Sequence, residues 1–247
     1  MSESLQYKFH ARVDSKRYFN RVKNPFIITK ERRLTDLVVK EIKSSDVIML
    51  EVGCGEGSNY HYLSERLPNL KYTGLDISKE KVVFFNDHFH GARAVCGDAI
   101  SLPFGPSSFD VILCRDIMHH VDFARERMIS EAMRVLRPQG KILILESNGK
   151  TLLNRLFMKL YPVERGMINS SPDQVMSLCS LFGQVKITSI EASLLVRGVG
   201  FVLGWSQGIE RYIKFPLYLF ASMWEKFIEV IIPKSRWTYL MYCIEKR

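Results

Sequence analysis

The side chains best placed for chemistry are acids associated with a glycine-rich segment. Glu51 directly precedes the run VGCGEGS (52–58). Glycines let a backbone turn sharply and approach a ligand closely. The dinucleotide pattern GxGxxG needs a glycine at position 58, where this chain has serine. Because the Glu51 carboxylate would repel a pyrophosphate, the segment suits a cationic ligand better.

Two further acids each follow a short apolar segment. Asp76 comes about 20 residues after the glycines, where a carboxylate can accept hydrogen bonds from both hydroxyls of a ribose. Asp98 stands in the sequence CGDA and can accept a hydrogen bond from an adenine amino group. Together with the glycine segment, these acids predict a nucleoside ligand with a free ribose and a positive tail that lacks phosphate.

Alternating strands and helices must position these residues. Apolar or alternating runs predict strands, and amphipathic runs bounded by Pro, Gly or capping residues predict helices. The expected strands are 47–52, 71–77, 92–96, 109–114, 141–147, 184–192 and 238–246, with a turn at 137–140. The expected helices are 31–43, 58–67, 78–89, 123–136 and one that begins after Ser171. This order predicts an α/β fold with helices on both faces of a parallel sheet, and its ligands at the carboxyl edge of the strands.

Five segments resemble, in order and spacing, the motifs of the class I S-adenosylmethionine-dependent methyltransferases. They are EVGCGEG, GLDIS, GDAISLPF, FDVILCRDIMHHV and EAMRVLRPQGKILILES, within about residues 45–147. The chain is most similar to the type 11-like subgroup that acts on small molecules and lipids. The resemblance implies a Rossmann-like three-layer αβα sandwich with a seven-stranded, mostly parallel sheet and an antiparallel last strand. It also implies S-adenosyl-L-methionine as cofactor and S-adenosyl-L-homocysteine as product.

The resemblance carries cofactor-binding roles to nine positions of this chain. They are Glu51, Gly53, Gly55, Asp76, Ile77, Asp98, Ala99, Cys114 and Arg115. The glycines with Glu51, and the pair at the end of the fourth strand, are expected to face the methionine portion. The other four are expected to contact the ribose and the adenine. Turn and capping duty is the alternative for the glycines and Asp76, and the cysteines are expected to pack rather than to act as nucleophiles.

His119 and His120 are the candidate catalytic residues, because they follow the fourth strand near the expected position of the transferred methyl. Methyl transfer from a sulfonium is an in-line displacement in which charge disappears, so alignment and desolvation supply much of the acceleration. A base is needed only if the acceptor must lose a proton. The unperturbed pKa of histidine suits that task. Packing against substrate or cofactor and a plain structural role are the alternatives.

The N-terminal segment 1–45 holds much of the excess positive charge. The chain has 35 Lys and Arg against 26 Asp and Glu, a net charge of +9. We expect this segment to form cap or lid helices, with Tyr18 and Phe19 over the cofactor; a helix that simply packs on the sheet is the alternative. Its charge also allows contact with nucleic acid, anionic lipid or an acidic substrate.

An apolar insertion at about 193–237 bears on the acceptor. Its two uncharged runs, 198–209 and 215–224, are too short to span a bilayer. A helix from Pro216 would align five apolar side chains, namely Phe220, Met223, Trp224, Phe227 and Ile231. This stripe is core, a substrate lid with Trp205, Phe220 and Trp224 facing the acceptor, or an interfacial helix that meets a membrane.

Several function classes are disfavoured by what the sequence lacks. It has neither the Asn/Asp-Pro-Pro-aromatic motif of amine methylation on bases, nor a Pro-Cys pair for cytosine chemistry, nor a recognisable RNA-binding domain. No metal site is expected, because no CxxC pair and no catechol-type metal cluster occurs. Five widely spaced cysteines and an N-terminus without an apolar h-region predict a cytoplasmic protein, with peripheral membrane contact allowed.

We therefore expect residues 1–247 to form one class I methyltransferase domain. Residues 1–45 form the cap, 46–150 the cofactor-binding core and 151–247 the C-terminal half. The expected reaction is methyl transfer to a small, apolar or lipid-like acceptor. The alternatives are an RNA or protein methyltransferase that uses the basic segment, or a non-catalytic S-adenosylmethionine-binding protein. Neither the acceptor atom nor the oligomeric state follows from the sequence.

Overall fold

Seven strands form one mixed sheet in the computed structural model, which describes residues 13–42, 44, 46–192 and 210–246. The strands are β1 (Ile48–Val52), β2 (Lys71–Asp76), β3 (Arg93–Cys96), β4 (Phe109–Arg115), β5 (Leu136–Ser147), β6 (Gln184–Glu191) and β7 (Tyr239–Glu245). Their order is β3-β2-β1-β4-β5-β7-β6, and β7 runs antiparallel to both of its neighbours. The expected seven-stranded, mostly parallel sheet with an antiparallel last strand is confirmed.

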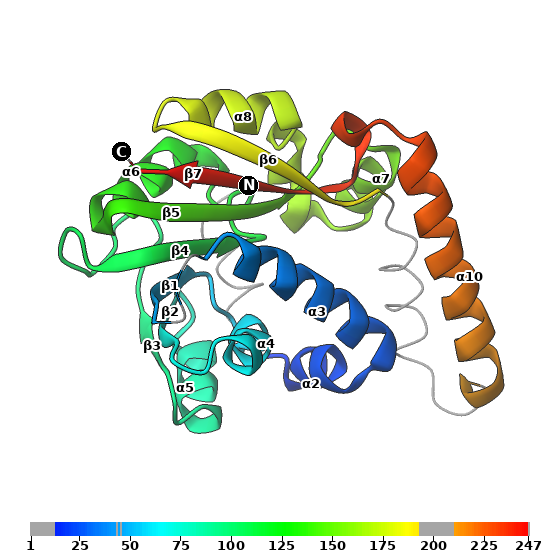
Figure 1. The fold of residues 1–247 in the computed structure, drawn as a ribbon, viewed down its shortest axis with the longest axis horizontal. Coiled ribbons are helices and arrows are strands. Elements are labelled where there is room, and N and C mark those ends of the chain that lie inside the picture. The colour runs from blue at the N-terminus through cyan, green and yellow to red at the C-terminus, as the bar shows by residue number, and fades with distance from the viewer. Residues whose placement is uncertain (1–12, 43, 45, 193–209, 247) are drawn as a thin grey trace.

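Helices lie on both faces of this sheet, and the long helix over residues 210–231 stands at its side (Figure 1). They are α2 (Ser15–Lys23), α3 (Pro25–Lys40), α4 (Ser58–Arg66), α5 (Lys79–His88), α6 (Arg125–Val135), α7 (Leu152–Leu160), α8 (Pro172–Ser180) and α10 (Glu210–Ile231), with 3-10 helices η1 (Asp122–Ala124), η2 (Pro162–Asn169) and η3 (Lys234–Arg236). Successive strand residues point to opposite faces. Leu50 therefore packs with α6 and α8, whereas Met49 packs with α3, α4 and α5. Because both faces are buried, the central strands read as continuous apolar runs.

The sequence places a turn at 137–140, but these residues belong to β5. Gln139 has a left-handed φ of 62°, and the β4–β5 register shifts between Phe109 and Val111. A Cβ at Gly140 would lie 2.8 Å from the Asp110 carbonyl oxygen, so only glycine allows the two backbones to approach here. Strand β5 therefore includes residues 137–140, and the hydrogen-bond ladder between β4 and β5 is irregular at this point.

The parallel strands end at one edge of the sheet, and the candidate site residues lie there. The glycine segment follows β1, Ile77 follows β2, and His119 lies in the loop after β4. Right-handed crossovers impose this common edge. Within the described ranges, no helix is long and apolar enough to cross a membrane.

Candidate active site

The loop between β1 and α4 has three left-handed glycines. Gly53, Gly55 and Gly57 have φ values of 79°, 54° and 84°. A Cβ at Gly53 would lie 2.7 Å from Ile117 Cδ1, and one at Gly57 would meet the rings of α5 and its cap. Among the residues that the structure describes, none comes within 4 Å of a Cβ built at Gly55. The loop is therefore packed at both ends and open at its middle glycine.

Asp76 ties this loop to the end of β2. Its Oδ2 accepts a hydrogen bond of 2.9 Å from the Gly55 N–H, and its Oδ1 accepts one of 2.9 Å from the Ser78 N–H. Each carboxylate oxygen has a second lone pair that these bonds do not use. Asp76 can therefore hold the loop through these bonds and still accept hydrogen bonds from ribose hydroxyls.

The ends of β2 and β3 lie together beside Asp76. The Gly97 N–H donates to the Asp76 carbonyl oxygen at 3.0 Å, which brings Asp98 to the same edge. Asp98 is exposed, and its Oδ1 accepts from the Ile100 N–H at 3.0 Å. Ile77 is exposed too, whereas Ala99 is buried. An apolar and an acidic side chain are therefore accessible next to Asp76.

Glu51 is fully buried behind the loop. Its carboxylate accepts hydrogen bonds from the Asn59 amide and the Tyr72 hydroxyl. Burial raises the pKa of Glu51 to about 7, because removal from water disfavours the charged form more than these bonds and the nearby Arg115 favour it. Glu51 can therefore change its charge near neutral pH.

Arg115, at the end of β4, forms a buried ion pair with Glu31 of α3. Its Nη1 and Nη2 donate to the two Glu31 oxygens at 2.5 and 2.9 Å, and Nη1 also donates to Asn59. Burial alone would raise the pKa of Glu31, but the guanidinium holds it well below its usual range. Cys114 is packed in the core, and burial raises the pKa of its thiol. The Arg115–Glu31 ion pair holds α3 against the carboxyl end of β4. No local sequence pattern indicates that Glu31 or Asn59 contacts Arg115.

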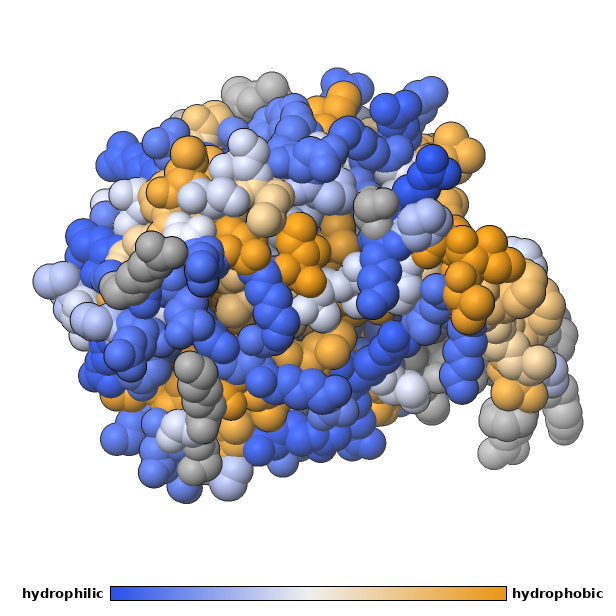
Figure 2. Space-filling view, turned by 45° about the horizontal axis from the view of Figure 1, so that its top comes forward, coloured by the Kyte–Doolittle hydropathy of each residue, from blue (hydrophilic) through white to orange (hydrophobic). Residues whose placement is uncertain are grey.

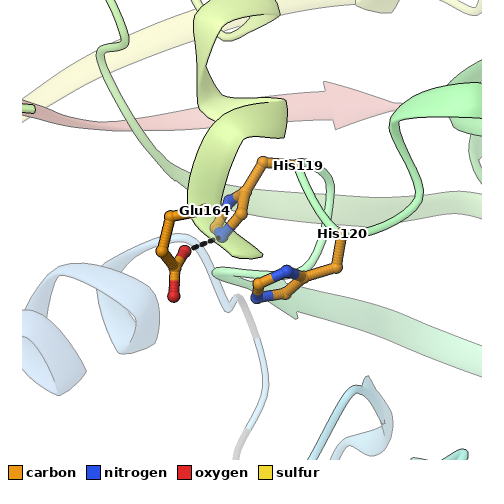
Figure 3. Close-up of side chains that lie close together, drawn as sticks. All are labelled: His119, His120 and Glu164. Atoms are coloured by element: carbon orange, nitrogen blue, oxygen red, sulfur yellow. Dashed lines mark ion pairs between the residues drawn. The ribbon is translucent and has the colours of Figure 1, made fainter. Parts of the chain in front are cut away.

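His119 lies between two carboxylates. Its Nδ1 contacts Glu146 at the end of β5, and its Nε2 lies 2.9 Å from Glu164 Oε2 of η2 (Figure 3). Burial alone would lower the pKa of His119, but the two acids raise it to about 10. A protonated ring has no lone pair to accept a proton. The half-buried His120, whose ring centroid is 4.0 Å from that of His119, remains the candidate base.

The N-terminal helix α2 lies beside the glycine loop. Tyr18 is buried and makes edge contacts with rings of α5 and its cap, whereas Phe19 is more exposed and has the Lys23 ammonium 4.7 Å from its ring. Arg21 Nη1 donates to the Ser58 hydroxyl at 3.0 Å, at the start of α4. These contacts hold α2 beside the loop, as a cap requires.

The residues expected to face the acceptor lie in the C-terminal insertion, which the structure describes in part. Trp205 lies outside the described residues. Phe220 and Trp224 lie on α10 with centroids 6.4 Å apart, and both are exposed, as is the rest of the stripe that the sequence aligns with them. Glu225 is instead buried. The apolar stripe therefore faces outward rather than into the described core.

The strand order with an antiparallel β7, together with the left-handed glycine loop after β1, defines a class I methyltransferase fold. Residues 50–144 match the family model described as "Methyltransferase domain", and the chain contains such a domain. This stretch contains the five sequence motifs except for the last three residues of the fifth, 145–147.

Curated relatives match a stretch of about 100 residues of the chain. A phthiotriol/phenolphthiotriol dimycocerosates methyltransferase of Mycobacterium tuberculosis (strain ATCC 25177 / H37Ra) is 40% identical over 94 residues, which are 37% of this chain and 34% of that protein. A fatty-acid O-methyltransferase of Mycolicibacterium smegmatis is 35% identical over 102 residues, 40% of this chain and 36% of that protein. The chain thus matches about a third of these relatives' length.

Solved structures share the fold over most of the chain. Phosphoethanolamine N-methyltransferase 2 of Haemonchus contortus has a TM-score of 0.68 at 17% identity, covering 100% of this chain and 61% of that one. The plantazolicin methyltransferase BpumL has a TM-score of 0.62 at 20% identity, covering 99% and 95%. These similarities extend the fold to the N- and C-terminal parts outside the matched domain.

Proposed function

We propose that this protein is an S-adenosylmethionine-dependent methyltransferase whose acceptor is apolar or lipid-like. The observation that carries the proposal is the left-handed glycine loop bound to the Asp76 carboxylate, with open space beside Gly55. The match to a methyltransferase domain supports the reaction class. The relatives named for dimycocerosates and a fatty acid support the acceptor class.

The residues of this chain fit such a cofactor. Gly55 leaves room for close approach, Asp76 can accept the ribose hydroxyls, and the exposed Ile77 and Asp98 can contact the adenine. Buried Glu51 lies next to the loop and can favour an ammonium group. When bound, the cofactor supplies an electrophilic methyl on a sulfonium. The protein aligns the acceptor, excludes water and, where the acceptor must lose a proton, offers His120.

An exposed apolar surface supports the lipid-like acceptor and a peripheral contact with membrane. We use the term apolar surface for the exposed apolar side chains that α7 and α10 each carry: Leu152, Leu153, Leu156, Phe157 and Leu160 on α7, and Leu219, Phe220, Met223, Trp224, Phe227, Val230 and Ile231 on α10. Figure 2 shows hydrophobic side chains gathered on the side of the molecule where α10 lies. Among the side chains the structure describes, the exposed charges on these two helices are basic: Arg155, Lys159 and Lys226. Apolar and basic side chains together are typical of binding to an anionic lipid interface.

The rival acceptors, RNA and protein, receive less support. They depend on the basic N-terminal segment, yet several of its charges form internal ion pairs. Lys30 pairs with Glu191 at 3.3 Å, and Arg33 pairs with Glu229 at 2.9 Å. We would incubate the protein with methyl-labelled S-adenosylmethionine and an extract split into lipid, small-molecule, RNA and protein fractions. Label in the lipid fraction is the expected result, whereas label in RNA or protein would refute the acceptor class.

Cofactor affinity should depend on pH through Glu51. Its pKa of about 7 means that the free site holds a proton at lower pH, whereas a bound ammonium favours the carboxylate. We expect the affinity measured by calorimetry to rise between about pH 5.5 and about pH 7.5, below the pKa of the ligand's own amino group. In Glu51→Gln the affinity should be flat over this window. An equally steep rise of cofactor affinity with pH in the variant would show that Glu51 does not act on the cofactor.

Removing leucines from the apolar surface should weaken membrane contact. Leu156→Ser/Leu160→Ser is expected to lower partition onto anionic vesicles about tenfold, because each leucine contributes buried apolar area. Sedimentation with vesicles measures this. Val83→Ser/Leu181→Ser is the matched control, since these side chains are as exposed but lie on α5 and beyond the end of α8. Equal loss in both variants would argue against a specific surface.

A further inference from the structure

We propose that His119, His120 and Glu164 bind a divalent transition-metal ion at the carboxyl edge of the sheet. One ligand atom from each residue lies within 4.8 Å of the others. Figure 3 shows the three side chains converging from the loop after β4 and from η2. Two imidazoles and one carboxylate form a donor set that coordinates zinc in proteins and also coordinates iron in non-haem sites with open positions.

The distances agree with a shared ion. Ligand atoms about 2.0–2.2 Å from one metal lie roughly 3.0–3.5 Å apart, depending on the angle between them. His119 Nε2 and Glu164 Oε2 are 2.9 Å apart, close to the lower end of that range. The ring of His120 lies beside that of His119, with centroids 4.0 Å apart. Small movements would therefore bring all three donors onto one ion, and His120 would then be a ligand rather than the base named for the metal-free site.

Glu146 supplies the support that metal-binding histidines usually have. It contacts His119 Nδ1 from the end of β5, and its side chain is 1% exposed. Binding of the ion would displace the proton from His119 Nε2, and the carboxylate at Nδ1 would then hold the tautomer whose Nε2 lone pair points toward the metal. Within the described part of the chain, Glu146 Oε2 has no hydrogen-bond partner. A divalent cation would balance Glu146 and Glu164 together.

The backbone around Glu164 is held in place. A Cβ at Gly166 would lie 1.8 Å from the carbonyl oxygen of His119, so η2 packs directly on the histidine loop. The Arg125 guanidinium donates to the carbonyl oxygens of Gly166 at 2.8 Å and Asn169 at 2.6 Å. A donor set on a braced backbone loses little entropy when it binds an ion. Three protein ligands leave positions open for water or for an oxygen atom of a substrate.

Metal titration of the full-length protein tests this inference without reference to methyl transfer. The protein is stripped with a chelator, dialysed and titrated with Co²⁺, whose visible spectrum reports coordination, and with Zn²⁺ in a calorimeter. One equivalent should bind with a Kd below about 10 µM. His120→Ala and Glu164→Gln should each weaken binding at least tenfold, and Glu146→Gln about 10–100-fold because it only orients His119.

His61→Ala is the matched control, because the half-buried His61 and the exposed Glu65 form a pair 3.8 Å apart on α4, away from the three proposed ligands. It should bind metal like the wild type. Circular dichroism and urea unfolding check that the variants fold. No binding by the wild-type protein below about 100 µM would overturn the inference. So would unchanged affinity in both folded variants, His120→Ala and Glu164→Gln, since the ion would then bind elsewhere.

Discussion

Arg115→Ala should lower the free energy of unfolding by about 3–5 kcal/mol, because it leaves the Glu31 carboxylate buried without its partner. Both side chains are nearly inaccessible, at 5% and 3% exposed. The change also removes the donor that Arg115 offers to Asn59, the residue that in turn donates to Glu51. Urea unfolding at pH 7, monitored by circular dichroism, measures the loss.

Two comparisons make this prediction specific. Arg66→Ala breaks an exposed pair with Asp36 at 2.8 Å and should lower stability far less than Arg115→Ala, because solvent screens exposed pairs. Glu31→Leu/Arg115→Met removes both charges and should recover much of the stability, because most of the cost in the single variant is an uncompensated buried charge. If the single variant lost no more than Arg66→Ala, the pair would not anchor α3.

Asp76→Ala should weaken S-adenosylmethionine binding at least tenfold, about 1.4 kcal/mol. Two effects combine: the ribose hydroxyls lose their acceptor, and the Gly55 N–H loses the bond that holds the loop. Charge-assisted hydrogen bonds of this kind contribute about 1.5–3 kcal/mol each. Titration calorimetry with the cofactor and with S-adenosyl-L-homocysteine measures the change.

Asp110→Ala is the control that distinguishes a loss of stability from a loss of cofactor binding. Asp110 accepts from the Ile48 N–H at 2.9 Å and pairs with Arg137 at 2.9 Å, at the start of β4 and away from the carboxyl edge. Its removal should lower stability and leave cofactor affinity unchanged. Unchanged affinity in folded Asp76→Ala would exclude Asp76 from the proposed cofactor site.

Much of the sheet and of the loop follows from local sequence. Runs such as IMLEV (48–52) and KILILES (141–147) are apolar on both faces, and in this chain they are the central strands. Gly53 and Gly57 are required by left-handed backbone and close packing, which sequence spacing already indicates. The position of Asp76 near the glycine loop can also be predicted. One helix and one strand separate the two in the chain, so the end of β2 returns to the sheet edge where the loop lies. The family resemblance added the antiparallel β7.

Only the tertiary structure shows which distant charges meet. Glu31 pairs with Arg115 across 84 positions, and His119 meets Glu146 and Glu164 from two different elements. Helical periodicity aligns the stripe of α10, yet it carries no information on whether that face turns inward, and here Glu225 is buried while Trp224 is exposed. Local propensity and periodicity act over a few residues, so they determine the elements and the loop they carry. Burial and electrostatic pairing act through space, so charge partners and exposed faces are decided only when the elements pack.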